Sequence, residues 1–144
     1  ICIRSFLMLS CIKVQRYRGH NMEIHESAED YLEKILMLKN KNGTVRSIDI
    51  VNDLGYSKPS ISIAMKKLRE NGYIKMDDEN LITLTDSGMA IATRIYDRHK
   101  TLTDLLLHIG VTHENAEKDA CKIEHDISDE TFDHIKAFLK KDSI

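Results

Sequence analysis

The 144-residue sequence has few cysteines, a single proline and no long apolar run, and each shortage excludes a class of protein. Three cysteines, two of them within residues 1–21, do not make a disulfide framework, which indicates a reducing compartment. No apolar run reaches the length of about 18 residues that a membrane span needs, so we expect a cytoplasmic protein. The single proline and the 31% content of charged residues are typical of a globular chain with long helices.

The chain also lacks a strong charge of one sign. Because its formal net charge is only −2, an overall positive field cannot explain binding to nucleic acid. The distribution of charge is more informative: residues 46–75 contain six Lys/Arg against three Asp/Glu, whereas residues 101–144 contain five against ten. The first segment therefore suits phosphate groups, and the second suits cations.

The first 21 residues form a separate hypothesis. The chain begins with Ile1, and its first plausible initiator is Met22. The pair Arg18-Gly19 can be encoded by a purine-rich stretch at the place where a bacterial ribosome-binding site would lie. We therefore predict that residues 1–21 are a translated leader or disordered.

Apolar spacing and turn residues predict a helix-turn-helix in the first half of the chain. Serines at N-cap positions and glycine or asparagine at the far ends bound three expected helices, at about residues 27–41, 47–54 and 57–71. Two short β-prone runs follow, 73–76 and 81–84, joined by the acidic turn 77–80. These two strands would form a wing.

The second half of the chain predicts helices alone. A long helix is expected from Asp86 to His108, another from Thr112 or Asn115 to about Ile127, and a last one capped by Ser128. The predicted fold is mainly α: a winged helix-turn-helix with a two-stranded wing, followed by an all-α dimerisation domain. We place the DNA-binding domain at residues 22–92 and the helical domain at residues 93–144. Six apolar residues exceed what so small a domain can bury and predict a homodimer: Leu102, Leu105, Leu106, Ile109, Phe132 and Ile135.

The stretch 121–125 is the most informative of the sequence, because a thiol, a carboxylate and an imidazole fall within little more than one helix turn. Glu124 stands three residues after Cys121, and His125 stands four after it. On a helix the three side chains would lie on or next to one face. They are the donors that a transition metal prefers.

Two further segments could complete a metal shell: Asp30 and Glu33, three residues apart, and His99. Each residue also has a simpler interpretation. Asp30 could be the acidic partner in a capping box with Ser27, His99 a structural histidine, and Cys121 a small buried hydrophobe. Their joint presence in three helices around one winged head favours a metal site.

Binding to DNA is expected from the second helix of the helix-turn-helix, whose N-terminal residues reach base edges. These residues are Ser57, Lys58, Pro59, Ser60 and Ser62. Hydroxyls and a proline identify bases less uniquely than a bidentate arginine does, so specificity should depend partly on DNA shape. The candidate phosphate contacts are Arg46, Lys66, Lys67 and Arg69. Lys66 and Lys67 could instead be a solvated helix face, and the winged helix could serve protein contacts only.

The sequence resembles the diphtheria-toxin-repressor family of metal-dependent bacterial repressors, including its manganese-responsive branch. The resemblance covers about residues 27–138. Its most specific motifs are Glu29-Asp30-Tyr31-Leu32-Glu33, Ser57-Lys58-Pro59-Ser60-Ile61-Ser62, Leu84-Thr85-Asp86-Ser87-Gly88, Arg98-His99 and Cys121-Lys122-Ile123-Glu124-His125-Asp126-Ile127-Ser128. It implies a winged DNA-binding domain, a helical dimerisation domain and metal bound where the two meet. The chain looks like the short form, without the C-terminal β-barrel domain of long members.

The resemblance also implies a set of ligands. It places Asp30, Cys121, Glu124 and His125 in the main regulatory site, with Glu33 and His99 nearby in the same or an adjoining site. In the iron branch the position of Asp30 is typically Met and that of Cys121 is Cys, whereas in the manganese branch both are carboxylates. This chain has one residue from each branch.

A second site departs from the family pattern. The ancillary site of the iron branch has a carboxylate four residues after the histidine and an imidazole four before the cysteine, where this chain has Thr103 and Glu117. A second metal could still bind through His99, Glu117 and Glu33.

We therefore interpret the chain as a cytoplasmic, homodimeric repressor that binds one or two Fe²⁺ or Mn²⁺ ions per subunit. Metal-loaded protein would bind an inverted-repeat operator in double-stranded DNA and shut down metal-uptake genes. One alternative is a winged-helix regulator that metal does not control. Another is a hydrolase with two metals, although the sequence offers no spare nucleophile and no phosphate-binding glycine loop.

Overall fold

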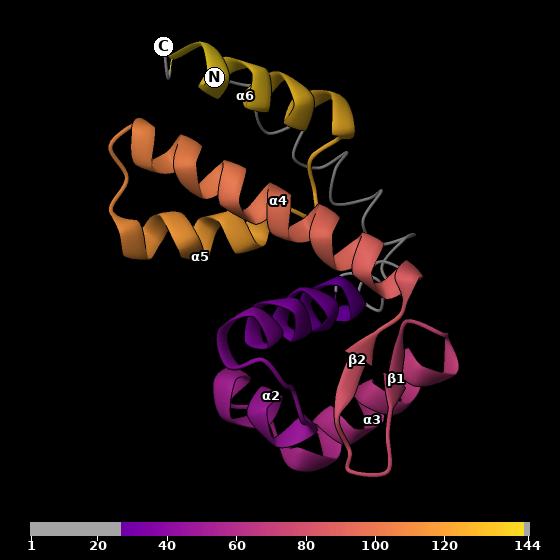
Figure 1. Ribbon diagram of the computed structural model, residues 1–144. Helices are drawn as coiled ribbons and strands as arrows, with labels where there is room; N and C mark the ends of the chain where they lie inside the picture. The colour runs from indigo at the N-terminus through magenta and orange to yellow at the C-terminus, as the bar shows by residue number, and fades with distance from the viewer. Residues whose placement is uncertain (1–26, 143–144) are drawn as a thin grey trace, which may run out of the picture.

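The structure is a computed structural model that describes residues 27–142, so the prediction for residues 1–21 lies outside it. The described chain forms a head, residues 27–84, and a helical body that consists of α4, α5 and α6 (Figure 1). Their elements follow in chain order: helix 27–42, α2 (Ser47–Leu54), α3 (Lys58–Glu70), β1 (Ile74–Met76), β2 (Ile82–Leu84), α4 (Asp86–His108), α5 (His113–Ile123) and α6 (Asp129–Asp142). This order confirms the mainly α fold with a winged helix-turn-helix. Within residues 27–142, no helix is long and apolar enough to cross a membrane.

Local capping explains where the helices of the head begin and end. Ser57 caps α3 because its hydroxyl accepts a hydrogen bond from the backbone N–H of Ser60 at 3.3 Å. Before α2, the backbone N–H of Arg46 donates to the carboxylate of Asp49 at 2.8 Å. The helix ends at Gly55, whose φ of +70° is left-handed and suits glycine.

The wing is an antiparallel hairpin beside α3. Its strands pair with Ile74 opposite Leu84. The Asp77 carboxylate stabilises the connecting turn, because it accepts hydrogen bonds from the backbone N–H groups of Glu79 and Leu81, each at 2.9 Å. The predicted wing is thus present, with its acidic turn at the tip.

The core of the head extends into the first part of α4. Buried apolar residues from every element of the head pack together: Leu32, Ile35, Leu36, Leu38, Val45, Ile50, Ile61, Met65, Leu68, Ile74, Ile82 and Ala92. Ala92 belongs to α4, so this helix joins the head to the body without a flexible linker. Helix 27–42 consequently lies between the rest of the head and the body (Figure 1).

The start of α4 is in tight contact with the wing. Thr85 caps the helix by accepting a hydrogen bond from the backbone N–H of Gly88 at 3.2 Å. A Cβ atom on Gly88 would lie only 2.0 Å from the carbonyl oxygen of Tyr73. Glycine is therefore required where helix and hairpin meet.

One predicted boundary is wrong: α5 ends at Ile123 and not near Ile127. The cause is Arg98 of α4, whose side chain is only 4% exposed. Its Nη1 donates to the carbonyl oxygens of Glu124 at 3.0 Å and Ile127 at 2.8 Å, and its Nη2 donates to the Asp129 carboxylate. These bonds hold residues 124–127 in a turn, after which Ser128 caps α6 as expected.

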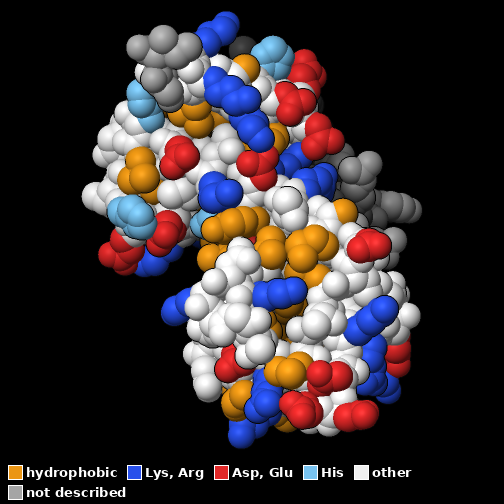
Figure 2. All heavy atoms as spheres, in the orientation of Figure 1, with side chains coloured by type: hydrophobic (Ala, Val, Ile, Leu, Met, Phe, Trp, Pro, Cys, Tyr) orange, Lys and Arg blue, Asp and Glu red, His pale blue; other side chains and the backbone are white. Residues whose placement is uncertain are grey.

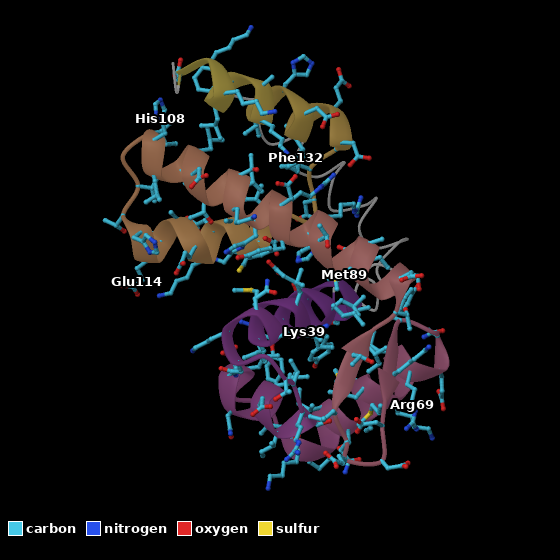
Figure 3. The ribbon with its side chains drawn as sticks, in the orientation of Figure 1. Lys39, Arg69, Met89, His108, Glu114 and Phe132 are labelled. Carbon is cyan, nitrogen blue, oxygen red and sulfur yellow. The ribbon has the colours of Figure 1, made fainter. Side chains whose placement is uncertain are left out.

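The body buries some of the apolar residues expected at a dimer interface and exposes others. Leu102 and Phe132 are buried within the body itself, and Figure 3 shows Phe132 between α6 and α4. Ile109, in contrast, is 66% exposed. Phe138, which was not among the expected interface residues, is 49% exposed. A groove of about 500 Å³ between α4 and α6, lined in part by Leu105 and Phe138, continues this apolar face.

Candidate metal centre and nucleic-acid interface

The imidazole of His125 links the head to the body. His125 lies in the turn after α5, and its ring is held between two carboxylates of helix 27–42. Its Nε2 is 2.7 Å from Oδ1 of Asp30, and its Nδ1 is 2.9 Å from Oε2 of Glu29. Residues separated by 95 and 96 positions thus meet at one ring.

Glu124 lies at the centre of the candidate site. Its side chain is completely buried, with Oε2 at 2.9 Å from Nδ1 of His99 and Oε1 at 3.3 Å from Nε2 of His125. The thiol of Cys121 is 3.6 Å from the same nitrogen of His99. One carboxylate therefore contacts two histidines, one from α4 and one from the turn after α5.

The donor atoms form two overlapping groups. His99, Cys121 and Glu124 make one, and Asp30, Glu124 and His125 make the other; within each group the donor atoms lie within 4.8 Å of one another. Glu124 belongs to both. The structure therefore places Cys121 with His99, whereas the resemblance placed it with Asp30 and His125.

The groups around both histidines favour the protonated form of the ring. Hydrogen bonds with Cys121 and Glu124 raise the pKa of His99 to about 10. Burial lowers the pKa of His125, but hydrogen bonds with Asp30 and Glu29 outweigh burial and raise it to about 10. Protons on the two rings thus offset the negative charge of the surrounding carboxylates.

Two buried carboxylate oxygens fit a cation. Among the described residues, neither Oε1 of Glu33 nor Oε1 of Glu124 has a hydrogen-bond partner. Burial, followed by the negative charge of Glu124, raises the pKa of Glu33 to about 7. A buried carboxylate oxygen without a donor costs free energy that a divalent cation would recover. Among these donors, the carboxylate oxygens suit Mn²⁺, and the imidazole and thiol suit Fe²⁺ and other softer cations.

The remaining predicted ligand, Glu117, lies at the edge. Its side chain is 55% exposed and lies 3.7 Å from Nδ1 of His113, one turn earlier in α5. It nevertheless lines the same cavity of about 410 Å³ as Glu33, His99 and Cys121. The structure thus brings Glu117 near the site without placing it in either donor group.

Three residues around the site were given no role there by sequence reasoning: Glu29, Arg94 and Arg98. Glu29 is buried and contacts Arg94 at 3.1 Å, while Arg98 holds the turn that carries His125. A signal was present in the spacing: Arg94 and Arg98 stand four residues apart, as do Glu29 and Glu33. Such pairs share a helix face.

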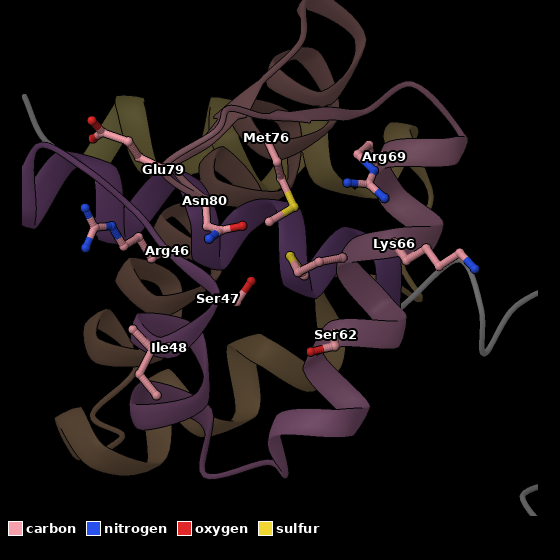
Figure 4. A pocket seen from close by; sticks show the side chains of 10 residues that line it. Arg46, Ser47, Ile48, Ser62, Lys66, Arg69, Met76, Glu79 and Asn80 are labelled. Carbon is pink, nitrogen blue, oxygen red and sulfur yellow. The ribbon is translucent and has the colours of Figure 1, made fainter.

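All nine predicted DNA contacts are exposed. They are Arg46, Ser57, Lys58, Pro59, Ser60, Ser62, Lys66, Lys67 and Arg69. Ser57 and Ser60 also contact each other, with their hydroxyl oxygens 2.8 Å apart. Figure 4 shows a groove with Lys66 and Arg69 on α3 at one side and Arg46 at the other. Basic groups therefore flank the surface that the recognition helix presents.

The wing tip has the opposite charge. Asp77, Asp78 and Glu79 are exposed there, and acidic side chains lie beside basic ones at this end of the head (Figure 2). Carboxylates repel DNA phosphates. We therefore expect α3, and not the wing tip, to make the main contacts with DNA.

Two family models match the chain. "Iron dependent repressor, N-terminal DNA binding domain" matches residues 23–80. "Iron dependent repressor, metal binding and dimerisation domain" matches residues 85–143. The first covers helix 27–42, α2, α3 and β1, and the second covers α4, α5 and α6.

Individual proteins are similar over most of the chain. An uncharacterised HTH-type transcriptional regulator of Methanocaldococcus jannaschii is 35% identical over 118 residues, 81% of this chain and 94% of the relative. The transcriptional regulator MntR of Escherichia coli is 34% identical over 116 residues, 81% of this chain and 75% of the relative. A solved manganese-dependent transcriptional repressor in complex with manganese is 30% identical with a TM-score of 0.71, covering 78% of this chain and 52% of that one. The chain spans about half the length of the solved structures named for manganese regulation.

Proposed function

Since the chain belongs to the iron-dependent repressor family, the diphtheria-toxin-repressor family that its motifs resemble, we propose that Fe²⁺ or Mn²⁺ switches on its binding to DNA. It is a metal-responsive transcriptional repressor that acts on double-stranded operator DNA as a homodimer. We further propose that it controls genes for metal uptake and acts in the cytoplasm, where chromosomal DNA lies.

The observation that supports this proposal most strongly is the position of Glu124. Its completely buried carboxylate belongs to both donor groups. The rings of His99, at 2.9 Å, and His125, at 3.3 Å, are its partners, and its Oε1 accepts no hydrogen bond among residues 27–142. A buried carboxylate needs such compensating positive charge, which a cation can also supply. A cation at this point would join donors from helix 27–42, from α4 and from the turn after α5.

We propose a division of the ligands between two ions. Asp30, Glu124 and His125 would hold one, and His99, Cys121 and Glu124 the other, with Glu33 nearby and Glu117 at the rim. When bound, the ions would supply positive charge and coordinate bonds to this shared set of donors. The division into a DNA-binding domain at residues 22–92 and a helical domain at residues 93–144 is part of the same proposal.

The residues themselves explain why metal would affect DNA binding. Asp30 and Glu33 belong to helix 27–42, whose apolar residues are part of the core of the head, whereas His99 and Glu124 belong to the body. Fixing these groups together restricts the placement of the head on the body. In a dimer this placement sets the distance between two recognition helices, which must match successive major grooves. Metal can favour the arrangement that fits DNA only by as much free energy as it gains from binding that arrangement more tightly than the other arrangements of head and body.

On DNA, we propose that Ser57, Pro59 and Ser60 at the start of α3 contact base edges, with Lys58 and Ser62 beside them. The phosphate contacts would come from exposed basic side chains: Arg46, Lys66, Lys67 and Arg69. A two-fold dimer presents this surface twice, which favours an inverted-repeat operator.

We propose regulation and not hydrolysis, although the donor set could also activate water. Both halves of the chain match domains described for repressors, and the relatives are transcriptional regulators. The role of the metal would thus be to fix the head relative to the body, and not to activate water.

The test is a selection of double-stranded DNA with a randomised centre by the full chain, followed by anaerobic binding titrations with Mn²⁺ or Fe²⁺. We expect tight binding with either metal, loss of binding with a chelator, and loss with Glu124→Gln. The matched control Glu114→Gln, an exposed glutamate of α5, should behave as the unaltered chain. Binding that a chelator leaves unchanged would favour a winged-helix regulator that metal does not control.

A further inference from the structure

The buried carboxylate of Glu29 contacts the ring of His125 on the side away from the candidate metal donors. Glu29 lies on helix 27–42 and is only 7% exposed, whereas the neighbouring Asp30 is 55% exposed. The two residues face different nitrogens of His125: Glu29 faces Nδ1 and Asp30 faces Nε2. Glu124 lies on the Nε2 side, at 3.3 Å.

Arg94 of α4 keeps the Glu29 carboxylate in place. Its Nη2 donates to Oε1 of Glu29 at 3.1 Å, while Oε2 of the same carboxylate faces His125. Arg94 also approaches the Asp129 carboxylate at 3.8 Å, and Asp129 accepts from Arg98, which holds the turn of His125. Glu29 and the backbone of residues 124–127 are therefore fixed through adjoining contacts in the body.

We propose that Glu29, held by Arg94, is a positioning residue that fixes the tautomer and orientation of His125. By accepting the Nδ1 proton, Glu29 leaves Nε2 directed at Asp30 and Glu124, where a metal ion would be bound. A histidine ligand commonly donates its other N–H to a carboxylate, which orients the ring and makes the ligand nitrogen more basic. This inference rests on the proposed function, because it assumes that His125 is a ligand.

The unaltered chain provides the first test. We would load full-length protein, labelled with ¹⁵N at histidine, with Zn²⁺, which is diamagnetic, and record the imidazole spectra. We expect the proton of His125 on Nδ1, slow to exchange and in a hydrogen bond, with Nε2 bound to Zn²⁺. Zn²⁺ on Nδ1, or an Nδ1 proton that exchanges freely with water, would overturn the proposal.

Variants provide the second test, with Mn²⁺ affinity measured by calorimetry. Glu29→Ala should lower the affinity by about 10- to 100-fold, the usual effect of removing such a partner. Glu29→Gln should recover part of the loss, because its amide oxygen can still accept the Nδ1 proton. Glu114→Ala, which removes an exposed carboxylate of α5, should change nothing.

The outcomes separate this inference from the proposed function. Wild-type affinity in Glu29→Ala, together with normal binding by the unaltered chain, would overturn the positioning role alone. An unaltered chain that binds neither Mn²⁺ nor Zn²⁺ would contradict the proposed function. If Glu29→Ala fails to fold, as judged by its thermal melting without metal, the histidine spectrum of the unaltered chain decides.

Discussion

At the scale of single residues, the choice of metal depends on what surrounds Glu124. One side of this carboxylate has the harder oxygen donor Asp30 with His125, and the other has the softer thiol of Cys121 with His99. Oxygen ligands suit Mn²⁺, whereas thiolate favours Fe²⁺, Co²⁺ or Zn²⁺. The two sides should therefore differ in which metal they prefer.

We expect that Cys121→Glu shifts activation of DNA binding towards Mn²⁺, because it replaces the only sulfur of the donor groups by oxygen. Asp30→Met should shift activation towards Fe²⁺ and Co²⁺. The measurement is an anaerobic DNA-binding titration with one metal at a time. If Cys121→Ala left the order and affinity of the metals unchanged, Cys121 would be a packing residue.

At the scale of elements, the junction of α4 and the wing has no room for a larger residue at Gly88. We expect Gly88→Ala to destabilise the protein by roughly 1–3 kcal/mol, because the new methyl group would overlap the backbone carbonyl of Tyr73. Thr93→Ala, on an exposed position of the same helix, is the control and should change stability little. Urea unfolding of metal-free protein measures both, and equal midpoints would show that the backbone there moves freely.

Different residues of the recognition helix α3 should contact DNA bases and DNA phosphates. Neutralising Lys66, Lys67 or Arg69 should weaken binding to all DNA sequences. The slope of log K against log salt concentration should become shallower by about 1 for each DNA phosphate that the variant leaves unpaired. Pro59→Ala should instead cost about 1 kcal/mol and relax the preference at a thymine. Binding measured over a series of salt concentrations, on selected and random DNA, distinguishes them; an equal loss on both DNAs for Pro59→Ala would contradict its role.

Local chemistry explains which elements could be predicted. The ends of α2 and α3 depend on capping groups within three or four residues, such as Ser57 and Gly55. The end of α5 depends instead on Arg98, which lies 26 to 31 residues from the groups it binds. No pattern within α5 contains that information.

The same distinction applies to the candidate site. Helical spacing brought Cys121, Glu124 and His125 into one hypothesis, but it could not show that Cys121 lies beside His99 while His125 lies beside Asp30. Sequence reasoning gave Glu29 no role at the site, because its partner His125 is 96 residues away. Packing of α4 against α5 decides the contact of Cys121 with His99. Packing of helix 27–42 against the body decides the contacts of Asp30 and Glu29 with His125.

At the scale of the whole molecule, the exposed apolar face of the body is the surface that we expect to mediate dimerisation. We expect Ile109→Asp to convert the dimer into monomers, because Ile109 is 66% exposed and a charge there would oppose burial at an interface. Ile63→Asp is the matched control, since Ile63 is 58% exposed but lies on α3. Sedimentation of the full chain measures both, and a stable Ile109→Asp dimer would place the interface elsewhere.

The head and the body meet at one group of ligands, so metal is expected to act as a cross-link between them. The most direct test is anomalous diffraction from crystals grown anaerobically with Mn²⁺ or Fe²⁺. We expect metal bound by Asp30 from helix 27–42 together with Glu124 and His125 from the body. Metal bound by body residues alone, with Asp30 turned away, would contradict this cross-linking role.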